Sequence, residues 1–230
     1  MRHHGLLSLV VSHCLAGLLA FSAFGQTPAP PRLESPAASP GGVALQWSGV
    51  GVDGFAYRIQ SREDLAESLW LPAGPFPNPT DSTGHRTGLD TPFAPERSLN
   101  TARPARGVDS MEIRWETVRT PADGYVNLTG RFEPVEHVVA YAVTHIRSPR
   151  AMRTTLLLGS DDGVKVFLNG KEILRNLIVR GAEPDQERIP LDLGAGMNVL
   201  LLKIENNLGA FGFYARILDK EGVLRMSAAR

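Results

Sequence analysis

The sequence almost lacks cysteine, since its single cysteine, Cys14, lies near the start of the chain. Around it are the features of a secretion signal: a positive charge at Arg2, an apolar stretch over residues 6–21, and small residues before Gln26. Residues 1–25 are therefore predicted to be a signal peptide, with an uncleaved N-terminal anchor as the alternative, and the exported chain would contain no cysteine. Disulfides, a thiol nucleophile and a thiolate metal site are excluded from such a chain.

An excess of charge of one sign is also missing, because 24 Lys and Arg residues balance 24 Asp and Glu residues. Without a basic stripe, nucleic acid is not an expected partner. After the signal, no segment approaches the about 20 apolar residues that a membrane-spanning helix needs. We expect a protein that is secreted, periplasmic or held at the cell surface, with no membrane contact after signal cleavage.

Helical periodicity is nearly absent, whereas short runs of alternating β-branched and aromatic residues recur between Gly, Pro, Asn and Asp. This pattern predicts an all-β fold, an antiparallel β-sandwich of the jelly-roll type. The predicted strands cover residues 111–117, 127–132, 135–146, 154–158, 164–168, 172–179, 188–193, 199–205 and 211–218.

Changes in composition divide the chain before the sandwich. Residues 26–40 are rich in Pro, Ala and Ser and are predicted to form an extended linker. Residues 41–69 contain two short β-type runs, at 43–47 and 55–61. These runs resemble the front half of a fibronectin type III module and either fold as a unit of their own or add a β-hairpin to the sandwich. The sandwich itself is predicted to span residues 70–230.

The segment 159–170, GSDDGVKVFLNG, carries the clearest local signals. Residues 164–168 alternate as in a half-buried strand, and Asn169-Gly170 is typical of a type I′ hairpin turn. Asp161 and Asp162 place adjacent carboxylates on a loop at the sheet edge. Calcium prefers such oxygen ligands, so calcium is a candidate cofactor at this pair. The alternative is that Asp-Asp-Gly only forms a turn.

Residues 70–222 resemble a domain of secreted multidomain bacterial proteins that is related to galactose-binding-like and glycosidase sugar-binding jelly rolls. The resemblance rests on the motifs GPF (74–76), PFAPE (92–96), VVAYA (138–142), LGSDDGVKVFLNG (158–170), LLLKIENN (200–207) and GFYARI (212–217). The SDDG block also resembles protective-antigen-type β-sandwich domains, and in some adhesins of that type an adjacent Asp pair binds calcium that holds a sugar. The resemblance implies an accessory module rather than a catalytic domain, with Asp161 and Asp162 as calcium ligands.

Sugar sites combine planar side chains with amide, carboxylate and guanidinium groups that satisfy hydroxyls. Loops of the predicted sandwich supply such groups, so the predicted glycan contacts are Asp161, Asp162, Arg180, Asp185, Gln186, Asn206 and Asn207. The aromatic residues of the last strand, Phe211, Phe213 and Tyr214, are interpreted as core.

The expected function is a non-catalytic module that weakly binds carbohydrate or a cell-surface glycan. A structural or protein-interaction module, with another protein as its partner, is the alternative. A small hydrolase or lyase is the third reading, and no motif in the sequence selects a serine nucleophile or a catalytic carboxylate pair for it.

Overall fold

The computed structural model describes residues 32–33, 37–39, 42–44, 47–48, 68–121 and 123–228. The chain divides into one unit, His13–Ser61, and a second formed by Met1–Ser12 and Arg62–Arg230. In the smaller unit, β1 (Arg32–Leu33) pairs antiparallel with β4 (Trp47–Ser48), and β2 (Ala37–Ser39) with β3 (Gly42–Ala44). The predicted signal peptide, most of the predicted linker and the run 55–61 lie outside the described residues.

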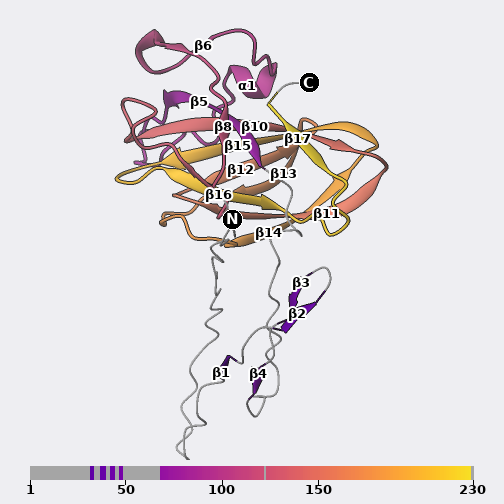
Figure 1. Ribbon diagram of the computed structural model, residues 1–230. Helices are drawn as coiled ribbons and strands as arrows, with labels where there is room; N and C mark the ends of the chain where they lie inside the picture. The colour runs from indigo at the N-terminus through magenta and orange to yellow at the C-terminus, as the bar shows by residue number, and fades with distance from the viewer. Residues whose placement is uncertain are drawn as a thin grey trace, which may run out of the picture. The chain divides into compact units, whose positions relative to one another are not determined.

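Residues 68–228 form a sandwich of two antiparallel β-sheets, which confirms the predicted all-β class (Figure 1). The larger sheet has seven strands, in the order β13-β12-β15-β10-β5-β8, with β17 also paired to β10. They are β5 (Leu69–Pro77), β8 (Val118–Arg119), β10 (Val138–Ser148), β12 (Val164–Leu168), β13 (Lys171–Asn176), β15 (Gly196–Asn206) and β17 (Arg225–Ser227). The smaller sheet has the order β14-β11-β16-β9. Its strands are β9 (Tyr125–Asn127), β11 (Met152–Ser160), β14 (Glu187–Leu193) and β16 (Gly212–Ile217).

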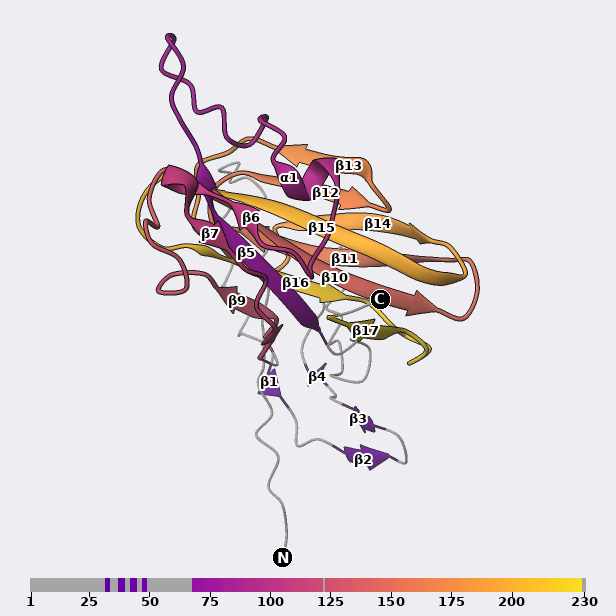
Figure 2. The same ribbon diagram turned by 90° about the horizontal axis from the view of Figure 1, so that it is seen from above.

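The central ladder of the larger sheet joins β10 and β15, which pair along their full length of 11 residues each (Figure 2). Side chains alternate across such a ladder, so one face of it packs against the smaller sheet. The core between the sheets is fully buried and includes Trp70, Ala140, Leu156, Leu158, Val164, Val166, Leu202, Ile204 and Phe213. Burial of this apolar layer is the main force that holds the two sheets together.

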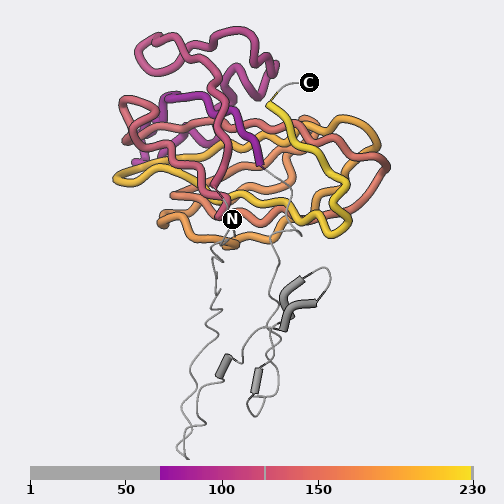
Figure 3. Tube along the Cα trace, viewed as in Figure 1, coloured from indigo at the N-terminus to yellow at the C-terminus, as the bar shows by residue number. Residues whose placement is uncertain are grey.

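Part of the outer face of the larger sheet is buried as well, because the segment 78–117 lies across it (Figure 3). This covering segment contains α1 (Ala94–Arg97), β6 (Ala105–Arg106), the 3-10 turn Val108–Ser110 and β7 (Glu112–Ile113). A second apolar cluster lies beneath it, with Leu71, Ala73, Phe76, Ile113, Val139, Tyr141, Val143 and Leu201. No helix among the described residues combines the length and apolar character needed to cross a membrane.

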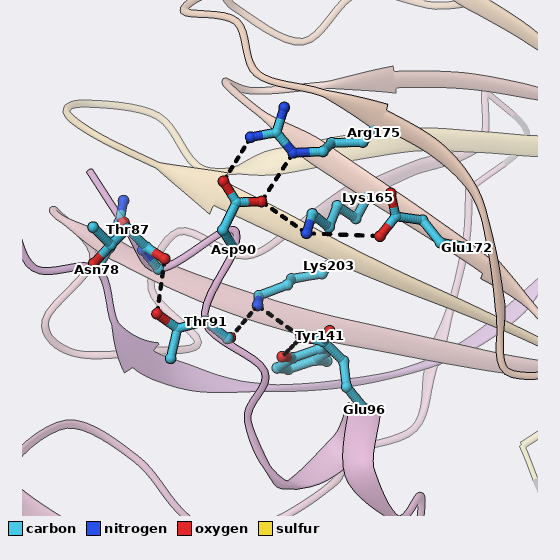
Figure 4. Close-up of polar contacts among 11 residues, drawn as sticks. Asn78, Thr87, Asp90, Thr91, Glu96, Tyr141, Lys165, Glu172, Arg175 and Lys203 are labelled. Atoms are coloured by element: carbon cyan, nitrogen blue, oxygen red, sulfur yellow. Dashed lines mark hydrogen bonds and ion pairs between the residues drawn. The ribbon is translucent and has the colours of Figure 1, made fainter. Parts of the chain in front are cut away.

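Ionic contacts fasten the covering segment to the sheet (Figure 4). The fully buried Lys203 donates to a Glu96 carboxylate oxygen at 2.7 Å and to the Thr91 carbonyl oxygen at 2.6 Å. The hydroxyl of Tyr141 donates to the same Glu96 oxygen. Burial lowers the pKa of Lys203, and the hydrogen bond that Lys203 donates to Glu96 opposes that effect. The Lys203 charge is thus stabilised inside the protein only while the covering segment is in place.

A second ionic group lies nearby, around Asp90 of the covering segment (Figure 4). Arg175 donates to both of its carboxylate oxygens, at 2.9 and 2.6 Å, and Lys165 approaches within 2.8 Å. Arg175 most strongly, with Lys165, holds the pKa of Asp90 far below its usual range. Three positive side chains of the larger sheet, those of Lys165, Arg175 and Lys203, are therefore paired with carboxylates of the covering segment.

Alternation predicted some strands and failed at others: residues 111–117 alternate, yet β7 covers only Glu112–Ile113. The strand predicted at 164–168 is confirmed, and its hairpin turn has the positive φ angles expected of Asn169 (52°) and Gly170 (81°). The nine-residue strand β5, LWLPAGPFP, was not predicted because three prolines argue against a strand. The strand predicted at 127–132 is wrong, since β9 ends at Asn127 and a turn follows.

Replacing Glu96 by alanine should leave Lys203 buried without a charged partner. We expect a loss of about 3 kcal/mol in the free energy of unfolding, because removing one partner of a buried ion pair leaves the other charge buried without compensation. Urea denaturation measures it. The matched control is Glu112→Ala, which breaks an exposed ion pair with Arg114 and should cost less than about 1 kcal/mol. Equal losses in the two variants would contradict the anchoring role of Lys203.

Candidate functional site

The carboxylate of Asp162 ties two loops together at one end of the sandwich. One of its oxygens accepts a hydrogen bond from the backbone N–H of Arg180 at 3.0 Å, and the other accepts one from Asn207 at 2.7 Å. The backbone N–H of Asp162 donates in turn to the Arg180 carbonyl at 2.8 Å. Asp162 has a φ of 55°, a conformation that Asp tolerates better than most residues. It therefore fixes the loop after β13 against the loop after β15.

Arg180 is fixed on its other side through its guanidinium group. This group donates to the carbonyl of Ser160 at 3.2 Å and to the Ser160 hydroxyl at 2.9 Å. It also forms an ion pair with Glu187 at 2.8 Å, and both side chains are largely buried. The charge of Arg180 is thus matched within the protein, and the residue positions its loop.

Asp161, next in the chain to Asp162, belongs to the outer face of the smaller sheet. Its backbone N–H donates to the carbonyl of Gly212 at 3.0 Å, which extends the pairing of β11 with β16 by one residue. Leu156 and Leu158 face the core, so the alternation along β11 places Asp161 outward. Asp161 is only 7% exposed, and no donor among the described residues hydrogen-bonds its carboxylate.

Two tyrosines lie on the same outer face. Tyr125 of β9 pairs with Tyr214 of β16, and their ring centroids are 4.7 Å apart. The preceding residue, Phe213, lies in the core, so Tyr214 faces outward and its interpretation as a core residue is wrong. The Tyr125 hydroxyl lies so close to Gly212 that a Cβ there would come within 2.4 Å of it. It therefore lies beside the residue that pairs with Asp161.

The loop before β14 borders this face. The carbonyl of Glu183 lies within 1.7 Å of the place that a Cβ on Gly159 would occupy, so only glycine fits beneath the loop. A backbone N–H of β11 donates to the Gln186 side chain at 3.1 Å. Asp185 forms an ion pair with Arg216 of β16. We call Asp161, Tyr125 and Tyr214, with Asp185, Gln186 and Arg216 at their border, the tyrosine patch.

The electrostatics of the patch are dominated by Asp161. Burial and, to a smaller extent, the neighbouring charge of Asp162 raise the pKa of Asp161 to about 6. None of the described cations lies where it offsets this shift. Burial, followed by the charge of Asp161, also raises the pKa of Tyr125 above its ordinary value. At neutral pH the patch therefore holds an ionised carboxylate beside a protonated phenol.

The geometry around the Asp pair bears on the predicted calcium site. Calcium takes six to eight oxygen ligands. Within residues 68–121 and 123–228, no three acidic or histidine side chains converge on a common point. Both carboxylate oxygens of Asp162 already accept backbone hydrogen bonds. Asp161 is the member of the pair whose carboxylate has no hydrogen-bond donor among the described residues, and calcium at Asp161 and Asp162 stays a prediction.

The structure gathers most of the predicted contact residues at one end of the sandwich. Those at the patch are Asp161, Asp185 and Gln186, and those that tie the adjoining loops are Asp162, Arg180 and Asn207. Asn206 lies apart, because it is fully buried and its amide donates to the Val135 carbonyl at 2.7 Å. The sequence reasoning missed Tyr125, Tyr214 and Arg216, although alternation with Phe213 gave a signal for the last two.

The chain matches no protein-family model and none of the curated proteins. Solved structures give distant likenesses. An anti-sigma factor domain-containing protein from Clostridium clariflavum is 14% identical, with a TM-score of 0.40; the match covers 68% of this chain and 44% of that one. A β-glucuronidase from Ruminococcus gnavus is 12% identical, with a TM-score of 0.41, over 71% of this chain and 30% of the enzyme. The chain thus spans less than half of either protein.

A third likeness is to the PA14 domain of the antifreeze protein MpAFP. It is 11% identical, with a TM-score of 0.39, and the match covers 75% of this chain and 96% of that domain. The neighbours therefore include a PA14 domain and a glycosidase. The assignment of the fold itself rests on the two sheets and their strand order.

Replacing Asp162 by alanine should free both loops that it joins. We expect a loss of about 2 kcal/mol in unfolding free energy, because two backbone N–H groups lose a charged acceptor. Hydrogen exchange should accelerate at the amides of Arg180 and Asn207 in particular. The control is Asp192→Ala, which removes a carboxylate from an exposed ion pair on the same sheet. Unchanged exchange at both amides would refute the proposed role of Asp162.

The pKa of Asp161 predicts a pH-dependent stability. The raised pKa means that the native state binds a proton more tightly than the unfolded state, so ionisation destabilises the fold as pH rises from about 4 to about 6. Asp161→Asn should raise Tm at pH 7 by roughly 2 °C, and the gain should vanish near pH 4.

The matched control for this pH series is Asp192→Asn. Arg153 holds the pKa of Asp192 below its ordinary value, so this substitution should bring no gain at pH 7. A stability gain in Asp161→Asn that is independent of pH would contradict the account.

Proposed function

We propose that this chain is an exported, non-catalytic β-sandwich module that binds carbohydrate at the tyrosine patch. The observation that carries the proposal is a nearly buried carboxylate, Asp161, with no donor of its own, beside a pair of outward tyrosine rings. Aromatic rings pack on the apolar faces of sugars, and carboxylates accept hydrogen bonds from hydroxyls. A bound hydroxyl would supply the hydrogen bond that Asp161 lacks.

The same proposal includes the type of jelly roll, export from the cell and a role in binding rather than catalysis. The motifs between residues 70 and 222 favour a relationship to galactose-binding-like jelly rolls. The apolar stretch 6–21 favours export through a signal peptide. Glycoside hydrolysis usually needs two carboxylates that reach the substrate. At this site Asp162 is engaged by two backbone donors, which favours binding over catalysis.

A glycan-array screen of the purified protein tests the proposal. We expect a specific signal that falls at least tenfold in Asp161→Asn and in Tyr214→Ala, because these changes remove the carboxylate acceptor and the stacking ring. The matched control, Asp192→Asn, removes an exposed carboxylate elsewhere on the same sheet and should retain the signal. A signal that is equally strong in all variants would place the sugar elsewhere, and a blank array from folded protein would refute carbohydrate binding.

The second candidate, a protein-interaction module, has one observation in its favour. Leu177, Ile178 and Val179 follow one another in the loop after β13, and they are 52%, 39% and 81% exposed. Consecutive exposed apolar residues of this size are a common feature of interaction surfaces. Val179→Ser would separate the two functions, since it should weaken a protein contact and leave glycan binding unchanged.

A further inference from the structure

The tyrosine patch carries negative charge that the protein does not neutralise. Its border cation, Arg216, is matched by Asp185, and Arg180 of the adjoining loop is matched by Glu187. Asp161 has no such partner, and its pKa is shifted only by burial and by another carboxylate.

Asp123, in the turn before β9, adds a negative charge close to Tyr125. Asp161 and Asp123 thus bring two carboxylates close to the Tyr125 ring. A ligand that brings a positive charge would therefore be favoured over a neutral one of the same shape.

The tyrosine rings favour a particular kind of cation. The faces of aromatic rings attract ammonium groups, and a carboxylate next to such rings adds direct charge pairing. Tyr125 and Tyr214 form a ring pair that adjoins the backbone pairing of Asp161 with Gly212. An organic ammonium group satisfies both features at once.

A metal ion fits this arrangement less well. A hard cation such as calcium requires six to eight oxygen ligands, and the Asp pair alone supplies few of them. In the part of the chain that the structure describes, no cluster of three acidic or histidine side chains completes such a site. The open carboxylate and the rings are therefore better matched by an amine than by a divalent ion.

We propose that the tyrosine patch selects sugars that bear a protonated amine, of the glucosamine type, over N-acetylated and neutral sugars. The inference rests on the proposed function and names its ligand class. The ammonium group lies against Asp161, while the sugar ring packs on Tyr214. Acetylation removes the positive charge and adds bulk at the same position, so it weakens the contact.

Calorimetry with three tetrasaccharides, of glucosamine, N-acetylglucosamine and glucose, tests this selectivity at pH 6.5 in low salt. We expect the glucosamine tetramer to bind at least tenfold more tightly than the other two. Asp161→Asn should abolish that preference, and Tyr214→Ala should weaken binding of the glucosamine tetramer. The control, Asp192→Asn, changes the net charge equally but should keep the preference within about twofold, since a surface charge away from the site contributes little.

Four results would overturn the inference, and the first three concern binding of the tetramers. They are equal binding of the three tetramers, no binding of the glucosamine tetramer, and a preference for it that survives Asp161→Asn. A fourth is binding that requires added calcium and is lost with EDTA, which would assign the patch to a metal. Failure of the inference is distinguishable from failure of the proposed function, because a neutral glycan retained on the array through Asp161 and Tyr214 would preserve the latter.

Discussion

The carboxylate of Asp162 is the constraint on which the end of the sandwich depends. Two loops that are distant in sequence meet there, because each donates a backbone N–H to one of its oxygens. With Arg180 also held by Ser160 and Glu187, the loop before β14 is fixed beside the smaller sheet. The two adjacent aspartates therefore differ in role. Asp162 accepts the hydrogen bonds that hold the loops, and Asp161 has no hydrogen-bond donor among the described residues. The buried, unpartnered Asp161 lowers stability at neutral pH, and such a cost is common at binding sites.

The outer faces of the two sheets are covered to different extents. The larger sheet is covered by the segment 78–117, whose carboxylates pair with Lys165, Arg175 and Lys203 of its strands. The smaller sheet is covered only in part, by the loop that reaches across Gly159. Beyond this loop the two tyrosines keep partial contact with solvent. The ligand surface is therefore proposed on the sheet that the protein leaves open.

Much of the fold follows from local pattern, because alternating runs such as residues 164–168 encode both a strand and the face that it buries. Strand β5 could not be predicted in this way, since its prolines are acceptable only where neighbouring strands do not need their missing N–H groups.

The candidate site was predictable in part. The sequence marked Asp161 as part of a turn beside a strand. It could not show that only Asp162 accepts hydrogen bonds, because the backbone donors are 18 and 45 residues away from Asp162. Tyr214 was misread because an aromatic cluster near a chain end resembles core, and only register decides which ring faces outward. The covering role of 78–117 was also missed, since the path of a loop across a sheet is not encoded in local pattern.

The central claim is that the unpartnered carboxylate and the tyrosine pair form one binding surface. The most direct measurement is an NMR titration of the protein with the glucosamine tetramer, followed at backbone amides. Our account predicts that the largest shifts fall at Asp161, Tyr125 and Tyr214, with smaller shifts in the loop through Asp185. Shifts centred on Leu177–Val179, or on the covering segment, would contradict it.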